Sequence, residues 1–137
     1  MAKIKPHNGG KWTDARKKSF IVGALRRASS RWGPKNDAKG KARVRRGEYE
    51  CALCKTLGPA TLPPEEGKKR RRNNAAADHI NPVVDPSIGF VDWNTFIERL
   101  FCEIEGFQIL CWKCHTIVTK EERALAKERR DKEKLDG

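Results

Sequence analysis

Two Cys-x-x-Cys pairs constrain this 137-residue chain more than any other feature: Cys51 with Cys54, and Cys111 with Cys114. Each pair can present two thiolates from one tight turn, and four thiolates form a closed tetrahedral zinc site. The chain is 35% charged, so a domain this small and polar needs a staple beyond its hydrophobic core. We therefore predict a structural Zn²⁺ on these four cysteines, against the alternatives of unrelated buried thiols or a redox pair.

The fifth cysteine, Cys102, is predicted to be a small packing residue at the edge of an apolar helix face. Nothing in the sequence resembles a signal peptide or a membrane span. We therefore expect an intracellular protein, in the host cytoplasm if the chain is of phage origin. Thiols stay reduced there and serve as metal ligands before they form disulfides.

The charge of the chain is uneven and suggests three segments. The net charge is +12, and residues 1–50 carry fifteen basic against four acidic side chains. We predict a basic N-terminal helix and arm over 1–47, a core over 48–122, and a charged helical tail over 123–137. Within the first segment, residues 1–12 are expected to be an unstructured tail, and Thr13 caps a helix that Gly33-Pro34 ends. Residues 33–47 have almost no apolar content and are predicted to be extended or mobile.

The core segment is predicted to mix short strands with helices, which makes the fold α+β. A hairpin surrounds the first Cys pair, and residues 58–77 form a loop that ends in a basic run. The residues from 76 onward form a strand stopped by Pro82. A helix capped by Asp92 and ended by Gly106 follows, with apolar residues at helical spacing. A second strand over 107–111 leads to a last helix that begins at His115.

Two histidines suggest a second, catalytic site. His79 follows Asp78 on a predicted strand, where neighbouring side chains face opposite sides. A neutral imidazole can take a proton from water near neutral pH, and a carboxylate with a second imidazole can hold a divalent cation. The alternative is that His79 and His115 are packed or surface histidines without a catalytic role, as His7 in the basic tail is expected to be.

The stretches CALC, ADHINPVVDP and FQILCWKCHTIVT together resemble the HNH endonuclease family, especially its small zinc-stapled members from bacteriophages and mobile elements. The resemblance covers about residues 49–122 and implies a ββα-metal (His-Me) finger. It implies that His79 is the general base, and that Asp78 and His115 hold the catalytic Mg²⁺ or Mn²⁺. The implied reaction is DNA cleavage, by nicking or through both strands, that leaves 3′-hydroxyl and 5′-phosphate ends, in a homing-type or phage nuclease.

Two departures from the family pattern concern the loop that carries the base. The family's middle Asn, which pins that loop, falls here at Gly106. Asn94 is a substitute candidate on the predicted helix, and a plain solvated residue is the equal alternative. The family's Lys-Thr after the last His appears here as Val118-Thr119, with Lys120 one place later.

Basic flanks are expected to grip duplex DNA by its phosphates, which contributes affinity without sequence readout. The candidate contacts are Arg26, Arg27, Arg31, Lys68, Lys69, Arg70, Arg71 and Arg72. The rival hypothesis is a non-catalytic zinc-stapled nucleic-acid-binding module, and a weaker one is a ribosome-associated zinc ribbon. The protein is expected to act as a monomer or a homodimer, with no membrane contact.

Overall fold

The computed structural model describes residues 2–136, which divide into two compact units at Trp32 and Gly33. The prediction that residues 33–47 belong with the first helix is wrong, because the chain from Gly33 onward packs within the second unit. None of the helices among the described residues is long and apolar enough to cross a membrane.

The first unit contains helix α1, Asp14–Ser29, whose N-terminus is capped as predicted: Thr13 Oγ1 accepts a hydrogen bond from the Arg16 amide. The expectation of an unstructured tail is wrong for the residues next to the helix. His7 and Trp12 form a β-bridge, and His7 Nε2 lies 2.6 Å from Asp14 Oδ1. The Trp12 ring packs at 5.0 Å from Phe20, so this turn folds back onto α1.

The second unit begins with helix α2, Gly33–Ala42, where the composition predicts an extended segment. That prediction is wrong because tertiary packing stabilises the helix. Ala38 is buried, and α2 packs against the strand and short helix that bring in the second Cys pair. Pro34 is tolerated because the first turn of a helix has no amide partners to lose.

The first Cys pair lies in a hairpin, as predicted. Strands β1 (Arg43–Arg45), β2 (Glu48–Glu50) and β3 (Leu57–Gly58) form an antiparallel sheet in that order. The turn between β2 and β3 is closed by a hydrogen bond from the Cys51 amide to the Thr56 carbonyl. Lys55 takes a positive φ of 62° in this turn, which brings Cys54 back toward Cys51.

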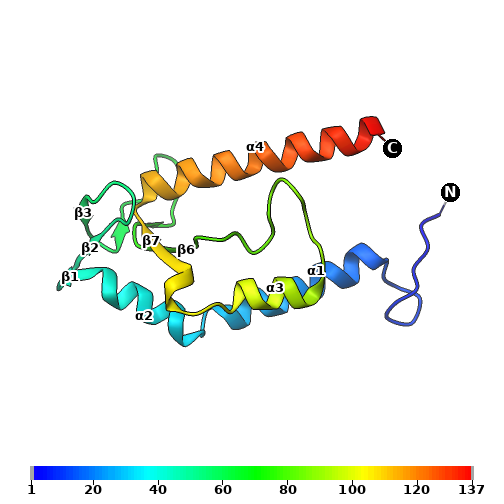
Figure 1. Ribbon diagram of the computed structural model, residues 1–137, viewed down its shortest axis with the longest axis horizontal. Coiled ribbons are helices and arrows are strands. Elements are labelled where there is room, and N and C mark those ends of the chain that lie inside the picture. Colours follow the sequence, from blue (N-terminus) through cyan, green and yellow to red (C-terminus); the bar gives the residue numbers. More distant parts are fainter. Residues whose placement is uncertain (1, 137) are drawn as a thin grey trace. The chain divides into compact units, whose positions relative to one another are not determined.

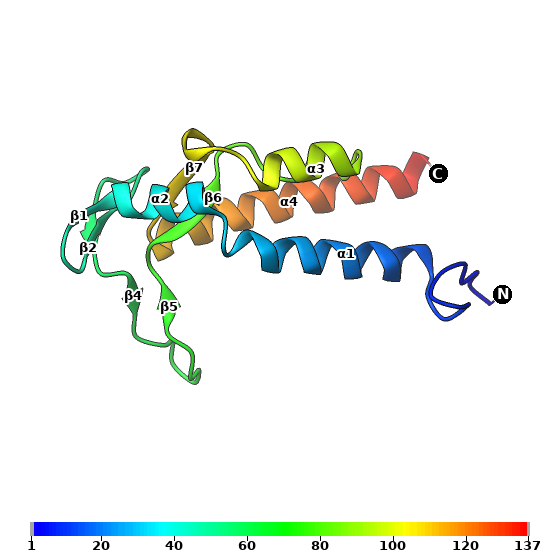
Figure 2. The same ribbon diagram turned by 90° about the horizontal axis from the view of Figure 1, so that it is seen from below.

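The segment after this hairpin is not the simple loop that its proline and basic content predict. Strands β4 (Thr61–Leu62) and β5 (Arg72–Asn73) pair in antiparallel register. The basic run therefore lies on a second hairpin, which extends away from the rest of its unit (Figure 2).

The centre of the second unit is the antiparallel pair of strands β6 (Ala76–His79) and β7 (Phe107–Leu110). Strand β7 leads directly into helix α4, Trp112–Asp136 (Figure 1). Both strands and the Pro82 stop agree with the sequence prediction. Leu110 is completely buried, and Ile109, Phe107 and Ala76 are nearly so. This small core fixes the register that determines where the polar residues of β6 and β7 lie.

Helix α3, Trp93–Leu100, begins as predicted, because Asp92 Oδ1 accepts a hydrogen bond from the Thr95 amide at 2.7 Å. Its buried face contains Phe96 and Leu100, each only 2% exposed. The helix ends earlier than the prediction of Gly106. The chain turns at Phe101 and then forms the short 3₁₀ helix η1, Ile104–Gly106, which leads into β7.

Candidate metal centre and catalytic strand

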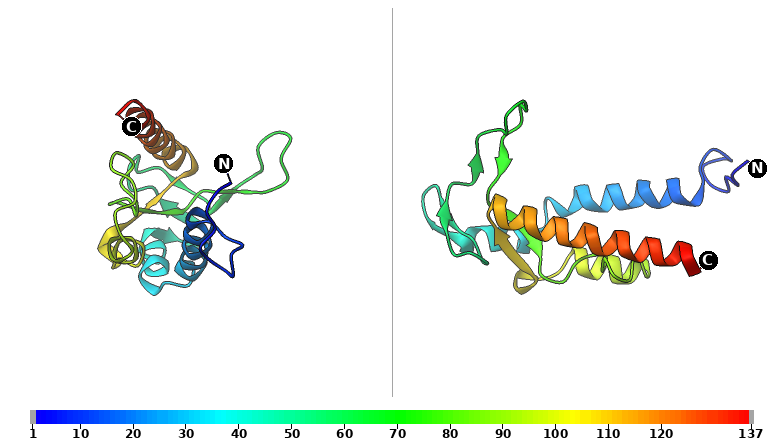
Figure 3. Two further views of the ribbon diagram at one scale, coloured as in Figure 1. Left: turned by 90° about the vertical axis from the view of Figure 1, so that its right-hand side faces the viewer. Right: turned by 90° about the horizontal axis from the view of Figure 1, so that it is seen from above.

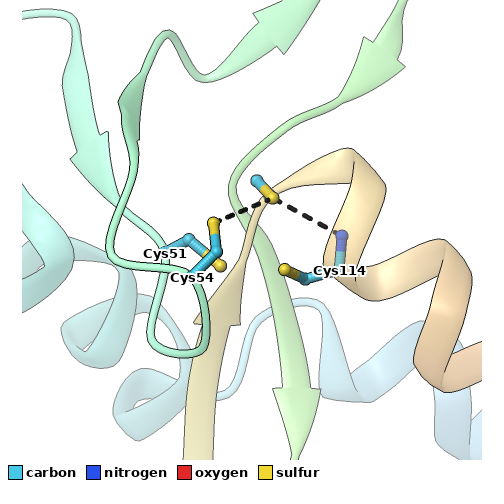
Figure 4. A group of neighbouring side chains, drawn as sticks. Cys51, Cys54 and Cys114 are labelled. Carbon is cyan, nitrogen blue, oxygen red and sulfur yellow. Dashed lines mark hydrogen bonds between the residues drawn. The ribbon is translucent and has the colours of Figure 1, made fainter.

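The four predicted cysteines meet in one cluster. Their sulfur atoms all lie within 4.8 Å of one another, although the two pairs are separated by more than fifty residues. Figure 4 shows Cys51 and Cys54 on the hairpin turn, facing the start of α4, where Cys114 lies. The Sγ atoms of Cys54 and Cys111 are 3.8 Å apart. A tetrahedral zinc site with Zn–S bonds of about 2.3 Å requires sulfurs about 3.8 Å apart, so the cluster fits this ion.

The protonation of the cluster also favours a cation. Hydrogen bonds from Thr56 lower the pKa of the exposed Cys54 thiol to about 6. Burial and the neighbouring thiols raise the pKa of Cys114 to about 12. Four thiols this close cannot all ionise beside one another, because each new thiolate repels the others. A divalent cation at their centre removes that repulsion, as happens in structural zinc sites.

Asn74 fixes the start of α4 against the hairpins, and the sequence analysis missed it. Its Oδ1 accepts a hydrogen bond from the Trp112 amide at 2.8 Å, and its Nδ2 donates to the Pro59 carbonyl at 2.9 Å. This side chain acts as an N-terminal cap supplied from a distant part of the sequence. As a result α4 begins at Trp112, inside the Cys turn, and not at His115 as predicted.

His79 and Asp78 lie on β6 and face opposite sides of the strand pair, as the alternation of a strand requires. The His79 ring packs at 4.8 Å from Phe107, its partner across the strands. Its Nε2 lies 3.0 Å from the backbone carbonyl of Leu100, at the end of α3. A carbonyl only accepts, so Nε2 carries the proton and Nδ1 of the neutral ring is left as an acceptor.

Asp78 lies on the side that α4 covers. Gln108, opposite it in the register, donates from Nε2 to Asp78 Oδ2 at 3.1 Å. His115 is half-buried in the first turns of α4, and α4 packs on both β6 and β7. The carboxylate and the imidazole that the family resemblance pairs therefore come from adjacent elements.

Glu122 is a further acidic residue on this side, and the sequence analysis missed it. Burial, and then the Asp78 carboxylate, raise the pKa of Glu122, whereas His115 acts to lower it. Glu122 follows His115 by seven residues, which is two turns along the same helix face. That spacing is a sequence signal that Glu122 shares a helix face with His115. No local signal points to Gln108, because the strand register that places it opposite Asp78 is a long-range property.

The loop after His79 is held by backbone groups and by an arginine. The Ile80 amide donates to the Gly106 carbonyl at 2.9 Å, and Arg99 Nη1 donates to the Pro82 carbonyl at 3.4 Å. Gly106 has no room for a side chain, because a Cβ there would lie 2.5 Å from Cys102 Sγ. Asn94 lies exposed on α3, and its predicted role in pinning this loop stays a prediction.

The predicted DNA contacts lie on both units. In the first unit, Arg26 and Arg27 lie in the last turn of α1, and Arg31 lies beyond its end; all three are exposed. In the second unit, residues 68–71 are exposed on the β4–β5 hairpin and Arg72 is half-buried.

Comparison of the chain with protein-family models, with curated proteins and with solved structures finds no match. Any assignment of its activity therefore depends on the residues of the site themselves.

Proposed function

We propose that this protein is a metal-dependent DNA endonuclease of the HNH type, with a structural zinc on its four cysteines. One observation carries the proposal. The strand that bears Asp78 and His79 pairs with a strand that leads through the Cys turn into the helix bearing His115. This order of strand, strand and helix supports the roles proposed for His79 as general base and for Asp78 and His115 as ligands of the cation.

His79 has the geometry of a general base. The hydrogen bond from Nε2 to the Leu100 carbonyl holds the ring in one orientation and leaves Nδ1 as the basic nitrogen. In the proposed reaction, Nδ1 takes a proton from a water molecule whose oxygen attacks the phosphorus. The bond from phosphorus to the 3′ oxygen breaks, and that oxygen takes a proton from solvent water, which leaves a 5′-phosphate and a 3′-hydroxyl end.

Asp78 and His115 have the donor set for the catalytic cation, a carboxylate oxygen and a neutral imidazole nitrogen. When bound, Mg²⁺ or Mn²⁺ supplies positive charge that stabilises the developing charge on the phosphate and the leaving oxygen. Gln108 orients the Asp78 carboxylate through its hydrogen bond. The half-buried Glu122 adds negative charge to the same side.

The test is cleavage of supercoiled plasmid by purified protein, with and without Mg²⁺, in buffer free of chelators so that the zinc remains. His79→Ala should lower the rate by about 100- to 10,000-fold, the usual range for general-base catalysis, and should keep its DNA affinity and zinc content. His115→Ala should lose activity that excess Mg²⁺ partly restores, because it loses a ligand and not the base. His7→Ala is the matched control and should cleave normally, because His7 pairs with Asp14 and is not among the residues of the proposed site.

Wild-type levels of Mg²⁺-dependent cleavage by His79→Ala would refute this mechanism. The second candidate is then the non-catalytic zinc-stapled nucleic-acid-binding module. A specific observation favours it. Within residues 2–136, the cysteine cluster is the only group of three or more potential metal ligands that lie close enough to share an ion. Tight duplex binding without cleavage under any divalent metal would support that candidate.

A further inference from the structure

We propose that the β4–β5 hairpin is a DNA-binding wing that lies along the phosphate backbone of duplex DNA, on one side of the cleavage site. This inference rests on the proposed function. It adds the surface that contacts the DNA, the side of the cleavage site on which that surface lies, and the length of duplex that it covers. The wing is defined as residues 61–73, and it projects from the unit beside the start of α4 (Figure 3).

The base of the wing is fixed to the metal centre. The Arg72 guanidinium lies over the Trp112 ring at 5.5 Å, and Arg72 Nε donates to the Pro63 carbonyl at 2.8 Å. Trp112 is itself held by Asn74, in the turn that carries Cys111 and Cys114. A rigid attachment matters because a preorganised contact loses less conformational freedom on binding.

The outer part of the wing presents its charge to solvent. Its turn is closed by a hydrogen bond from the Lys68 amide to the Glu65 carbonyl, and Gly67 in this turn has a φ of 80°. Lys68 lies 3.9 Å from the carboxylate of Glu65, so that pair is partly neutralised. Lys69 and Arg70 are exposed and have no ion pair or hydrogen bond within the described residues.

The five basic residues of the wing, Lys68 to Arg72, therefore divide into two groups: Lys68, Arg71 and Arg72 have partners within the described residues, and Lys69 and Arg70 do not. Arg72 anchors the wing, and Arg71 donates from Nε to Thr61 Oγ1 at 3.1 Å across the two strands. Lys69 and Arg70 are left to bind a polyanion, and duplex DNA is the partner that the adjacent candidate nuclease site requires. Such contacts go to phosphates and carry no sequence information of their own.

The position of the wing gives its contacts a direction. Strand β5 is separated from β6 only by Asn74 and Ala75, so the wing starts beside the strand that bears His79. From Asn73 to the turn at Gly67 the chain can reach up to about 20 Å at about 3.3 Å per residue. That reach corresponds to about six base pairs at 3.4 Å each along the duplex.

The experiment uses the full-length His79→Ala protein, which leaves the DNA intact, and a 30-base-pair duplex. Fluorescence anisotropy at several salt concentrations gives the slope of log K against log salt, and hydroxyl-radical footprinting gives the protected sugars. Replacing both Lys69 and Arg70 by Gln should reduce the slope by about 1.8, since each neutralised phosphate contributes about 0.9. Protection should shrink on one side only, by up to about six base pairs.

Two further variants test whether the position of the charge on the wing matters, and not only the amount of charge. Lys132→Gln with Lys134→Gln on α4 removes the same charge from exposed positions and should leave both the slope and the footprint unchanged. Arg72→Lys keeps the charge but loses the hydrogen bond to Pro63 and weakens the stacking on Trp112. It should therefore lose the one-sided protection and retain its zinc.

The outcomes distinguish this inference from the proposed function. If the His79→Ala parent binds the duplex but the Lys69 and Arg70 variant keeps its slope and footprint, the wing is refuted and the nuclease proposal stands. An equal loss of slope in the α4 control would also refute the wing, because any surface charge would then suffice. If neither the parent nor the wild type binds duplex DNA, both proposals fail.

Discussion

Gly106 offers the sharpest test of how the loop that carries His79 is held, because its environment leaves no space for a side chain. A Cβ at this position would lie 2.5 Å from Cys102 Sγ and 3.0 Å from Cys102 Cβ. Rotation of Cys102 can relieve the first contact but not the second, because the Cβ of Cys102 is fixed by the backbone. Gly106→Ala should therefore shift the chain at the junction of η1 and β7. The Gly106 carbonyl at this junction accepts a hydrogen bond from the Ile80 amide, so the loop after His79 should shift too.

The expected cost follows from overpacking. Inserting a methyl group into a closely packed site costs about 1–3 kcal/mol. For a unit of roughly 100 residues, the melting temperature should fall by about 4–8 °C for each kcal/mol lost. In a Cys102→Ala background the 2.5 Å contact is absent, so the same substitution should cost less, by about 0.5–3 kcal/mol, the range measured for coupled neighbours.

The assay is urea unfolding followed by tryptophan fluorescence, at one fixed zinc concentration because bound metal stabilises the folded state. Four proteins complete the cycle: the parent, the two single variants and the double variant. An equal loss from Gly106→Ala in both backgrounds would mean that the Sγ contact costs nothing and that the Cβ contact alone shifts the chain. A loss well below about 1 kcal/mol in the parent would refute the steric argument. The same reasoning predicts that Gly106→Asn, which introduces the Asn of the family that the sequence resembles, lowers stability instead of improving cleavage.

The other predictions concern the metal, the thiols and the acidic side of the site. Metal analysis should find about one zinc per chain, and Cys111→Ser should unfold or aggregate; a folded, metal-free variant would contradict the staple. Burial raises the pKa of Cys102, which leaves less thiolate, so the zinc-loaded protein should react slowly with a thiol reagent. Chelation should expose the four cysteines of the cluster, and Cys54, whose pKa is lowered to about 6, should react first. Because the pKa of the Glu122 carboxyl is raised, the folded state loses stability as the pH rises through that pKa. Glu122→Gln should therefore raise the melting temperature at pH 7 without Mg²⁺. The same substitution should give no gain in acid. Asn94→Ala should slow cleavage and spare binding and zinc content, and full activity would mean that the loop is held without it.

The parts of the fold that local chemistry specifies were predictable from the sequence. Thr13 and Asp92 cap their helices because a short oxygen-bearing side chain satisfies amides within its own turn. Each Cys-x-x-Cys spacing is a local signal of a turn that can present two thiolates to a metal, and the apolar runs near the second pair form the buried strand β7. These signals depend on neighbours within a few residues, so the sequence displays them directly.

The remaining features depend on contacts between distant residues. Helix α2 forms because Ala38 packs on the second unit's core, although its composition predicts an extended segment. Helix α4 begins three residues before His115 because Asn74 caps it from a position 38 residues away. Helix α3 stops at Leu100, and its carbonyl there is the partner of His79 Nε2.

The same division holds within the candidate site. The sequence by itself named the candidates and their order, since the four cysteines, Asp78, His79 and His115 could be picked out from motifs and spacing. Only the tertiary structure decided that Gln108 and Glu122 share a side with Asp78, because strand register and the packing of α4 on β6 are long-range properties. A local pattern states what a residue can do, whereas its partners are fixed only when separate segments pack together.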